Sequence, residues 1–443
     1  MKIKIIPTTE IAIFSSLLSS VATSNKVHKQ LKIMKVLGIT ALMILILMGV
    51  VGAAPFAYIT NYDSNNLSVI DTSTNKITAT VDVGEHPSGV AISPDETKAY
   101  VVNSRSNTVS VINTTKNKVI ATVKVGTYPQ KIAVSPDGTK AYVTSFSNNT
   151  VSVINTTINK VTATVPVGNF PFGVAVSPDG KKVYVANSGG YSTNFTGTVS
   201  VIDTTANTVA ATIPTGNNSL GVAISPGGKK VYVANMAGSS ISIIDTISNA
   251  VVSTVKTGRN PKGVAVSPDG KKVYVAINPI NSLTGAVDII DTATNKVTAT
   301  VPVGKAPSGI EVTQDGAKVY VVNYASHTVS VIDTSTNRVT DTVPVGKYPI
   351  EVAFGNFIDS NVTDPIITTN STVTEDIKVG DIASPSSEEI NAVELNNSKN
   401  NNSESDNGNS SNENESSKNN STPGFGLLGS LVCLYGGWKL GKK

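Results

Sequence analysis

The chain has 443 residues, of which 5% are aromatic and 15% charged, and its single cysteine, Cys433, excludes a disulfide framework or a Cys-ligated metal site. It is rich in Val, Thr, Asn, Ser and Gly, which favours short strands and turns and excludes a helical bundle. The formal net charge of +4 is small for this length, so no basic surface for nucleic acid is expected.

The first predicted element is an apolar run near the N-terminus, from Val36 to Val51. Two lysines precede it and the small residues Gly52 to Ala54 follow. This order is typical of a secretory signal peptide, so we expect residues 1–54 to be an N-terminal extension and signal peptide. A retained transmembrane anchor is the alternative, although the run is shorter than the ~20 residues that a span needs. Met34 is a second candidate for the start of the chain.

Residues 55–358 contain one unit repeated seven times. Its clearest mark is a strand that begins with Tyr, and successive tyrosines are 42 to 48 residues apart: Tyr58, Tyr100, Tyr142, Tyr184, Tyr232, Tyr274 and Tyr320. A period in the low forties with only strand-like content predicts the blades of a propeller. The two long repeats carry extra Gly-, Ser- and Asn-rich residues around 189–196 and 280–284, which we expect to be surface loops.

Each repeat divides into four predicted strands, named A to D here. In the second repeat these are residues 89–92, 99–102, 108–112 and 119–125. A Pro-Asp-Gly turn, as at Pro136, joins A to B, and an Asp/Asn-Thr-x-x-Asn turn joins C to D. Strand C alternates apolar and polar residues, which predicts one buried face.

The two ends of the repeat region are expected to pair. The first repeat begins at strand B, Phe56 to Asn61, and an additional strand A, Val352 to Phe354, follows the last strand D. That strand can complete the first blade as its innermost strand, which removes the open ends of the array. The predicted fold is therefore all-β: a seven-bladed β-propeller of four-stranded antiparallel blades closed by the N- and C-terminal strands, plus a disordered stalk and a C-terminal apolar segment.

The repeated motifs also point to a family. Tyr-Val-x-Asn, Ser-Pro-Asp-Gly and Val-x-Val-Gly in series resemble the YVTN-type seven-bladed β-propeller repeats of surface-layer proteins of methanogenic archaea. The resemblance covers residues 56–357 and every blade. It implies a structural or adhesive role at the cell surface.

Residues 359–422 are rich in Asn, Ser and Glu and hold few apolar side chains, so we expect a disordered stalk. The stalk contains eight candidate N-glycosylation sites: Asn361, Asn370, Asn396, Asn401, Asn409, Asn414, Asn419 and Asn420. Asn- and Ser-rich composition also creates such motifs by chance.

Residues 423–443 begin with Pro423-Gly424-Phe425 and continue with an apolar run and a lysine-rich end. A short span of this kind fits a tail anchor whose C-terminus lies in the cytoplasm. The segment resembles the PGF-CTERM sorting signal of archaeal surface proteins. That resemblance implies recognition by an archaeosortase, removal of the span and attachment of a lipid anchor. A retained transmembrane span is the alternative.

Candidate binding residues lie in the D–A loops, which we expect on the same face as the B–C loops and around the central tunnel. These candidate rim residues are His86, Tyr128, Phe170, Arg259, Lys305, Lys347 and Tyr348. A mixture of cationic and aromatic side chains suits a sugar or an acidic glycan. Glu311 and Glu351 replace small residues of other A strands, so we expect two carboxylates near the tunnel.

Catalytic patterns are weak in this sequence. His86 and His327 lie in different repeats and on loops of different type. Residues 61–65 space their oxygens like a calcium loop, but Asn66 and Thr72 stand where such a loop has Gly and a bidentate Glu, so a polar turn is expected.

We therefore expect a secreted, non-catalytic cell-surface protein, anchored to the membrane at its C-terminus, without cofactor or metal. Its expected partners are other cell-surface or surface-layer proteins or glycans, and not nucleic acid. One alternative is an extracellular enzyme of the lactonase or lyase kind that uses the rim around His86, Arg259 and Glu311. A small-ligand-binding sensor is the other.

Overall fold

The computed structural model describes residues 56–190, 196–279 and 284–354, and all structural statements below concern these residues. Its strands are β1 (Phe56–Asn61), β2 (Asn66–Asp71), β3 (Lys76–Asp82), β4 (Pro87–Ile92), β5 (Lys98–Asn103), β6 (Thr108–Asn113), β7 (Lys118–Lys124), β8 (Pro129–Val134), β9 (Lys140–Ser145), β10 (Thr150–Asn155), β11 (Lys160–Pro166), β12 (Pro171–Val176), β13 (Lys182–Asn187), β14 (Thr196–Asp203), β15 (Thr208–Asn217), β16 (Ser219–Ile224), β17 (Lys230–Asn235), β18 (Ser240–Asp245), β19 (Ala250–Lys256), β20 (Pro261–Val266), β21 (Lys272–Ile277), β22 (Gly285–Asp291), β23 (Lys296–Val303), β24 (Pro307–Val312), β25 (Lys318–Asn323), β26 (Thr328–Asp333), β27 (Arg338–Pro344) and β28 (Pro349–Ala353). One 3-10 turn, η1 (Tyr324–Ser326), joins β25 to β26.

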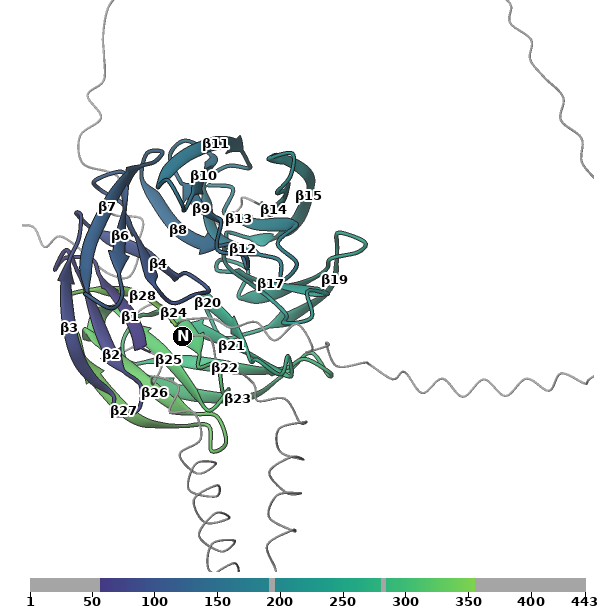
Figure 1. Ribbon diagram of the computed structural model, residues 1–443. Helices are drawn as coiled ribbons and strands as arrows, with labels where there is room; N and C mark the ends of the chain where they lie inside the picture. Colours follow the sequence, from purple (N-terminus) through teal and green to yellow (C-terminus); the bar gives the residue numbers. More distant parts are fainter. Residues whose placement is uncertain (1–55, 191–195, 280–283, 355–443) are drawn as a thin grey trace, which may run out of the picture. The chain divides into compact units, whose positions relative to one another are not determined.

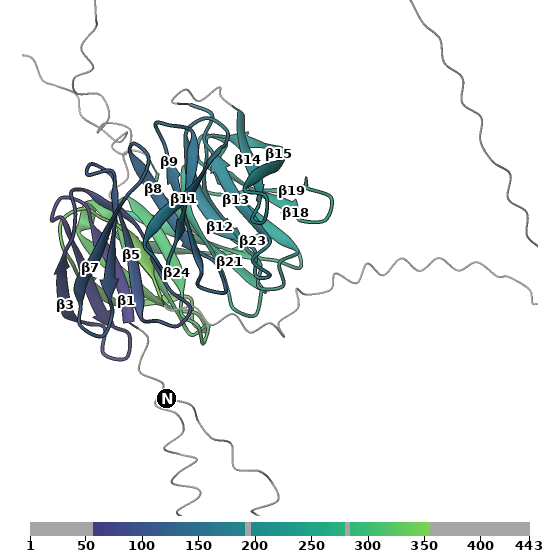
Figure 2. The same cartoon turned by 45° about the horizontal axis from the view of Figure 1, so that its top comes forward.

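These strands form seven antiparallel sheets of four strands each, which stand side by side around a common axis (Figure 1 and Figure 2). Six sheets follow the chain order, from β4–β7 to β24–β27, with strand A innermost. The seventh has the order β28-β1-β2-β3, so its inner strand comes from the other end of the repeat region. The predicted all-β, seven-bladed propeller is thus confirmed.

Ring closure depends on the pairing of β28 with β1. Tyr58 lies opposite Ala353 and Ile59 opposite Val352. The closing strand begins at Pro349, three residues before the predicted start. Proline has no N–H to donate, but it is tolerated as the first residue of a strand. Six of the seven A strands begin at a proline in this way.

The core consists of seven apolar clusters, each between two neighbouring blades. In one of them Ile59 and Ile70 of the first blade pack against Tyr320 and Val329 of the seventh. Because every blade is covered on both sides, strand C is also buried on both faces, and Ser110 of β6 is only 3% exposed. The prediction of a single buried face for strand C was therefore wrong.

A lysine at the start of strand B ties most blades to the next. Its Nζ donates to the carbonyl oxygen of a threonine in the following C–D turn, at 2.6 to 3.5 Å: Lys98 to Thr156, Lys140 to Thr204, Lys182 to Thr246, Lys230 to Thr292, Lys272 to Thr334 and Lys318 to Thr72. The first blade has Phe56 at this position. The last of these bonds joins the seventh blade to the first and reinforces closure.

Within residues 56–354, outside the two gaps, no helix has the length and apolarity needed to cross a membrane. The predicted signal peptide (1–54), stalk (359–422) and C-terminal segment (423–443) lie outside the described residues.

Candidate functional site

The D–A and B–C loops of a blade lie on one face because their backbones are hydrogen-bonded to each other. The N–H of Ser104 donates to the oxygen of His86 at 3.0 Å, and the N–H of Phe146 donates to that of Tyr128 at 3.2 Å. The N–H of Tyr62 donates to the oxygen of Tyr348 at 3.1 Å. In each of these blades the two loops therefore lie together on the same face of the propeller.

The residue before each strand A has a left-handed backbone, with φ between 52° and 57° in all seven blades: His86, Tyr128, Phe170, Asn218, Asn260, Ala306 and Tyr348. Asn and His tolerate this region, whereas a bulky side chain there is unusual and costs ~1 kcal/mol or more. Tyr128, Phe170 and Tyr348 therefore stand where Asn218 and Asn260 show that a less strained residue fits. Strain of this kind at a surface loop is a reason to suspect a binding function.

The aromatic rings of the D–A loops pack against rings of the B–C loops. Tyr62 stacks on His86 with ring centroids 4.1 Å apart, and Tyr324 lies 4.9 Å from Tyr348. We call the resulting set the aromatic arc: Tyr62, His86, Tyr128, Phe146, Phe170, Tyr324, His327 and Tyr348. It follows the loops of the seventh, first, second, third and fourth blades. Tyr62, Phe146 and Tyr324 were not predicted as site residues, although each directly follows the strand B motif.

Both imidazoles of the arc have structural roles. Nδ1 of His327 accepts a hydrogen bond from the N–H of Tyr348 at 2.9 Å, the role that Asn65 plays for His86 at 2.9 Å. His86 is half-buried beneath Tyr62, and this burial, assisted by the charge of Arg105, lowers its pKa. His86 is therefore mainly neutral at pH 7.

The cationic candidates lie one residue before the left-handed position, on the loops that enter the sixth, seventh and first blades. Arg259, Lys305 and Lys347 are exposed. The backbone N–H of Lys347 donates to Ser64 Oγ at 2.8 Å, and that of Lys305 donates to Ser326 Oγ at 2.7 Å. These hydrogen bonds fix the loop backbone from which the two lysine side chains extend. Lys347 is thus adjacent to the aromatic arc, whereas Arg259 lies on the side of the ring without aromatic loop residues.

The central cavity is a second candidate site, with a volume of about 1680 Å³. Most of its lining comes from the A strands and the A–B turns, with Tyr184 of β13 and Ile247 of a C–D turn, and it includes none of the seven candidate rim residues. Each strand A begins at its D–A loop, so the candidate rim residues lie just before the part of the strand that lines the cavity. The charged lining residues are Lys131, Asp179, Lys182, Lys229, Lys262, Asp269, Glu311 and Glu351, so both carboxylates expected near the tunnel are there.

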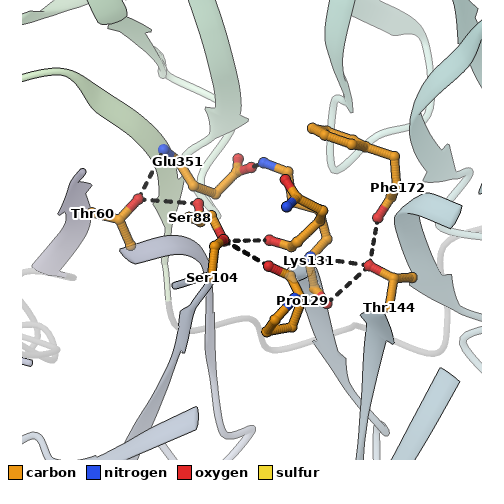
Figure 3. Close-up of polar contacts among 9 residues, drawn as sticks. Thr60, Ser88, Ser104, Pro129, Lys131, Thr144, Phe172 and Glu351 are labelled. Atoms are coloured by element: carbon orange, nitrogen blue, oxygen red, sulfur yellow. Dashed lines mark hydrogen bonds and ion pairs between the residues drawn. The ribbon is translucent and has the colours of Figure 1, made fainter. Parts of the chain in front are cut away.

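Lys131 and Glu351 form an ion pair at the wall of this cavity, as Figure 3 shows. Nζ of Lys131 also lies 5.8 Å from the centre of the Phe172 ring. Five of the seven A strands have glycine at the position of Lys131 and Glu351, so the two blades that differ supply opposite charges. Lys131 was not predicted as a site residue from the sequence.

Side-chain hydroxyls link the inner strands around this pair (Figure 3). Thr60 Oγ1 accepts from the N–H of Glu351 at 3.1 Å and donates to the oxygen of Ser88 at 3.2 Å. Thr144 Oγ1 accepts from the N–H of Lys131 at 3.1 Å and donates to the oxygen of Phe172 at 2.7 Å. Ser88 Oγ donates to the oxygen of Gln130 at 2.8 Å and links the second blade to the third. Neighbouring A strands belong to different sheets, so these bonds together hold the first to fourth blades at the cavity.

The structure offers little for a metal ion. In the described ranges no group of three or more His, Cys, Asp or Glu residues is arranged to hold one. In the calcium-like segment, Nδ2 of Asn61 donates to Asn66 Oδ1 at 2.9 Å and to Ser68 Oγ at 2.8 Å. The Asn61 amide nitrogen is thus engaged in its own hairpin, whereas its Oδ1 is buried without a hydrogen-bond partner among the described residues.

Comparison with known proteins supports the fold. No family model and no curated protein matches the chain. Among solved structures, it is similar to hydrazine synthase of Kuenenia stuttgartiensis, with 26% identity and a TM-score of 0.55 over 62% of this chain and 94% of that one. A functionally unknown protein from Desulfotomaculum acetoxidans is 19% identical, with a TM-score of 0.57 over 68% of this chain and 98% of that one. A putative 6-phosphogluconolactonase from Bacteroides fragilis is 15% identical, with a TM-score of 0.57 over 69% of this chain and 99% of that one.

These neighbours differ widely in their described functions, and the two under 25% identity show the fold alone. Propellers host unrelated functions, so the function of this chain must be argued from its own surfaces.

Proposed function

We propose that this chain is a non-catalytic binding protein of the cell surface, whose propeller presents the aromatic arc to a glycan or to another surface protein. The observation that carries this proposal is the left-handed backbone of Tyr128, Phe170 and Tyr348. These rings are retained at positions where the fold itself favours Asn, and aromatic rings stack well on sugar faces and on protein partners.

A non-catalytic role is supported by the use of the two imidazoles. His327 accepts a backbone hydrogen bond and His86 is stacked on Tyr62, so each already stabilises the loops. Lys131 of the cavity wall is similarly paired with Glu351. Groups with such structural partners are poorly placed to act as a general base or a nucleophile.

The cellular setting is proposed from the sequence. We propose that the signal peptide exports the chain, that the stalk is glycosylated, and that the Pro423-Gly424-Phe425 tail anchors it after processing by an archaeosortase. The YVTN resemblance favours a surface layer of an archaeon as the location. Peptide mapping of the protein from native membranes tests the processing step, since recovery of a peptide with Cys433 and Trp438 from most molecules would contradict it.

Replacing the rings by the residue of the neighbouring loops tests the binding proposal. The triple variant Tyr128→Asn, Phe170→Asn, Tyr348→Asn removes three rings and keeps a residue that tolerates the left-handed backbone. We expect an unchanged or slightly higher melting temperature and at least a tenfold loss of binding to isolated cell envelopes of the source organism.

The matched control changes the opposite face. Ile158 and Ile247 lie in C–D turns and are 56% and 84% exposed, so Ile158→Ser with Ile247→Ser alters that face without disturbing the core. This variant should bind as the unchanged protein does. Normal binding by the triple variant together with a loss of binding in the control would show that the binding surface is the face of the C–D turns, and would contradict the proposal.

A further inference from the structure

The central cavity contains a carboxyl group that the fold does not need. Glu311 is the fifth residue of β24, and the other six A strands have alanine there: Ala91, Ala133, Ala175, Ala223, Ala265 and Ala353. Glu311 is partly buried and lines the cavity. Among the described residues, the backbone N–H of Val312 is the group that favours its ionised form. Six alanines at this position show that the ring closes well without a carboxyl.

Over the described ranges Glu311 has no cationic partner like the one that Glu351 has in the cavity wall. Glu351 is paired with Lys131, whereas Glu311 has no salt bridge within the described part of the chain. Burial raises the pKa of Glu311 to about 8, and no neighbouring cation opposes the shift. Withdrawing a carboxylate from water without a partner costs free energy, so Glu311 weakens the fold. A destabilising group at a concave site is a candidate for binding.

We propose that Glu311 binds an amine-bearing small molecule inside the central cavity, with the ammonium group on its carboxylate. The body of the ligand packs against the alanine and valine side chains of the A strands, such as Ala265 and Val264. A volume of about 1680 Å³ leaves room for such a body together with water.

The chemistry of the wall favours an amine over other ligands. A calcium ion takes six to eight oxygen ligands, and one carboxylate on a wall of alkyl groups supplies too few. An anion gains no ion pair from Glu311, and Lys131 of the wall is already paired with Glu351. A single ammonium group needs only one anionic partner and gains most where that partner is poorly solvated.

The amine site is separate from the aromatic arc. The cavity lining includes Pro94, Pro136, Pro178 and Pro268 of the A–B turns, which lie at the opposite end of strand A from the D–A loops. A ligand would therefore enter through the A–B turns. Loss of the arc and loss of the amine site are expected to be independent.

Isothermal titration of the full chain with hexylamine tests the proposal, with hexanol as the neutral probe of the same length. Three proteins are compared: the unchanged chain, Glu311→Gln, and Glu311→Ala, which carries the residue of the other six blades. A fourth, Glu85→Gln, removes an exposed carboxyl, since the Glu85 side chain is 62% exposed. Melting curves of all four establish that they are folded.

The expected result is saturable binding of hexylamine to the unchanged chain and to Glu85→Gln, at least tenfold weaker binding to both Glu311 variants, and no binding of hexanol. Titrations in two buffers of different ionisation enthalpy should also show proton release on binding, because the ammonium group favours the ionised carboxyl. Equal hexylamine affinity in Glu311→Ala, or no binding to the unchanged chain at millimolar concentration, would overturn the proposal.

Discussion

Lys131 and Glu351 form an ion pair between the third and the first blade, across the blade that separates them. The intervening strand β4 has Gly89 at the equivalent position, and a Cβ atom there would lie 2.7 Å from the backbone oxygen of Gln130 and 2.9 Å from the Lys131 Cα. The two side chains are 17% and 16% exposed. The pair thus joins two blades that are not neighbours in the ring.

Removing one partner of this pair should cost more than removing both. We expect Lys131→Ala or Glu351→Ala alone to lower the free energy of unfolding by about 1–3 kcal/mol, because the remaining charge stays in a poorly solvated wall. The double variant should lose less than the sum of the two. Denaturant unfolding of the four proteins measures this coupling. Additive losses would mean that the ion pair does not stabilise the ring.

The sixth blade offers a test of how the D–A loops are held. In the second blade Asn103 Oδ1 accepts the N–H of Gly84 at 3.1 Å. The sixth blade has Ile277 at the asparagine position, and Asp288 Oδ2 accepts the N–H of Gly258 at 2.8 Å instead.

Asp288→Ser should therefore lower the free energy of unfolding by about 1–3 kcal/mol, because it leaves the N–H of Gly258 without this acceptor. Adding Ile277→Asn should recover much of the loss by restoring the arrangement of the second blade. Thermal and denaturant unfolding of the single and double variants measure the recovery. A double variant no more stable than Asp288→Ser would show that the two arrangements are not equivalent.

Because β28 closes the ring, we expect the melting temperature to depend strongly on this last strand. A chain that stops at Gly346 lacks β28 and exposes the edge of β1, whereas a chain that stops at Phe357 keeps the whole ring. We expect the shorter chain to melt at a much lower temperature and to aggregate, since an unpaired strand edge recruits other chains. Melting temperatures compared side by side test this. Equal values would contradict closure by β28.

The pH dependence of stability should carry the signature of Glu311. Burial raises its pKa from 4.5 to about 8. Between these values the folded protein keeps a proton that the unfolded chain has lost, so stability falls as the pH rises from about 4.5 to about 8. Glu311→Ala removes this contribution, and its advantage in melting temperature should grow between about pH 5 and about pH 8. An advantage that stays constant over this range would refute the burial argument.

The repeat made the architecture predictable from the sequence. The tyrosine period gave the blades, and the phase of the repeat gave the closing strand, because Phe56 begins a strand B and Val352 lies in a strand A without a blade of its own. The Pro-Asp-Gly turns marked where strands A and B meet. These signals are local, and each recurs often enough to be recognised.

The sites were less predictable because they depend on contacts between repeats. Nothing in the sequence distinguishes Lys131 from the other lysines, because its partner Glu351 lies in another blade and approaches it only in the folded ring. The packing of Tyr62 on His86 joins loops of different blades, and the left-handed backbone of Tyr128 follows from a loop geometry that its own side chain disfavours. The order of such residues in the sequence does not show which of them come into contact in the folded protein.

The central claim is that partners bind at the aromatic arc, and site-specific photo-cross-linking on intact cells tests it most directly. A photoreactive side chain is placed at Tyr348 in the arc or at Ile247, which is 84% exposed in a C–D turn. We predict that Tyr348 captures a defined surface protein or glycan and that Ile247 captures none. Capture of the same partner from Ile247, with none from Tyr348, would contradict the account.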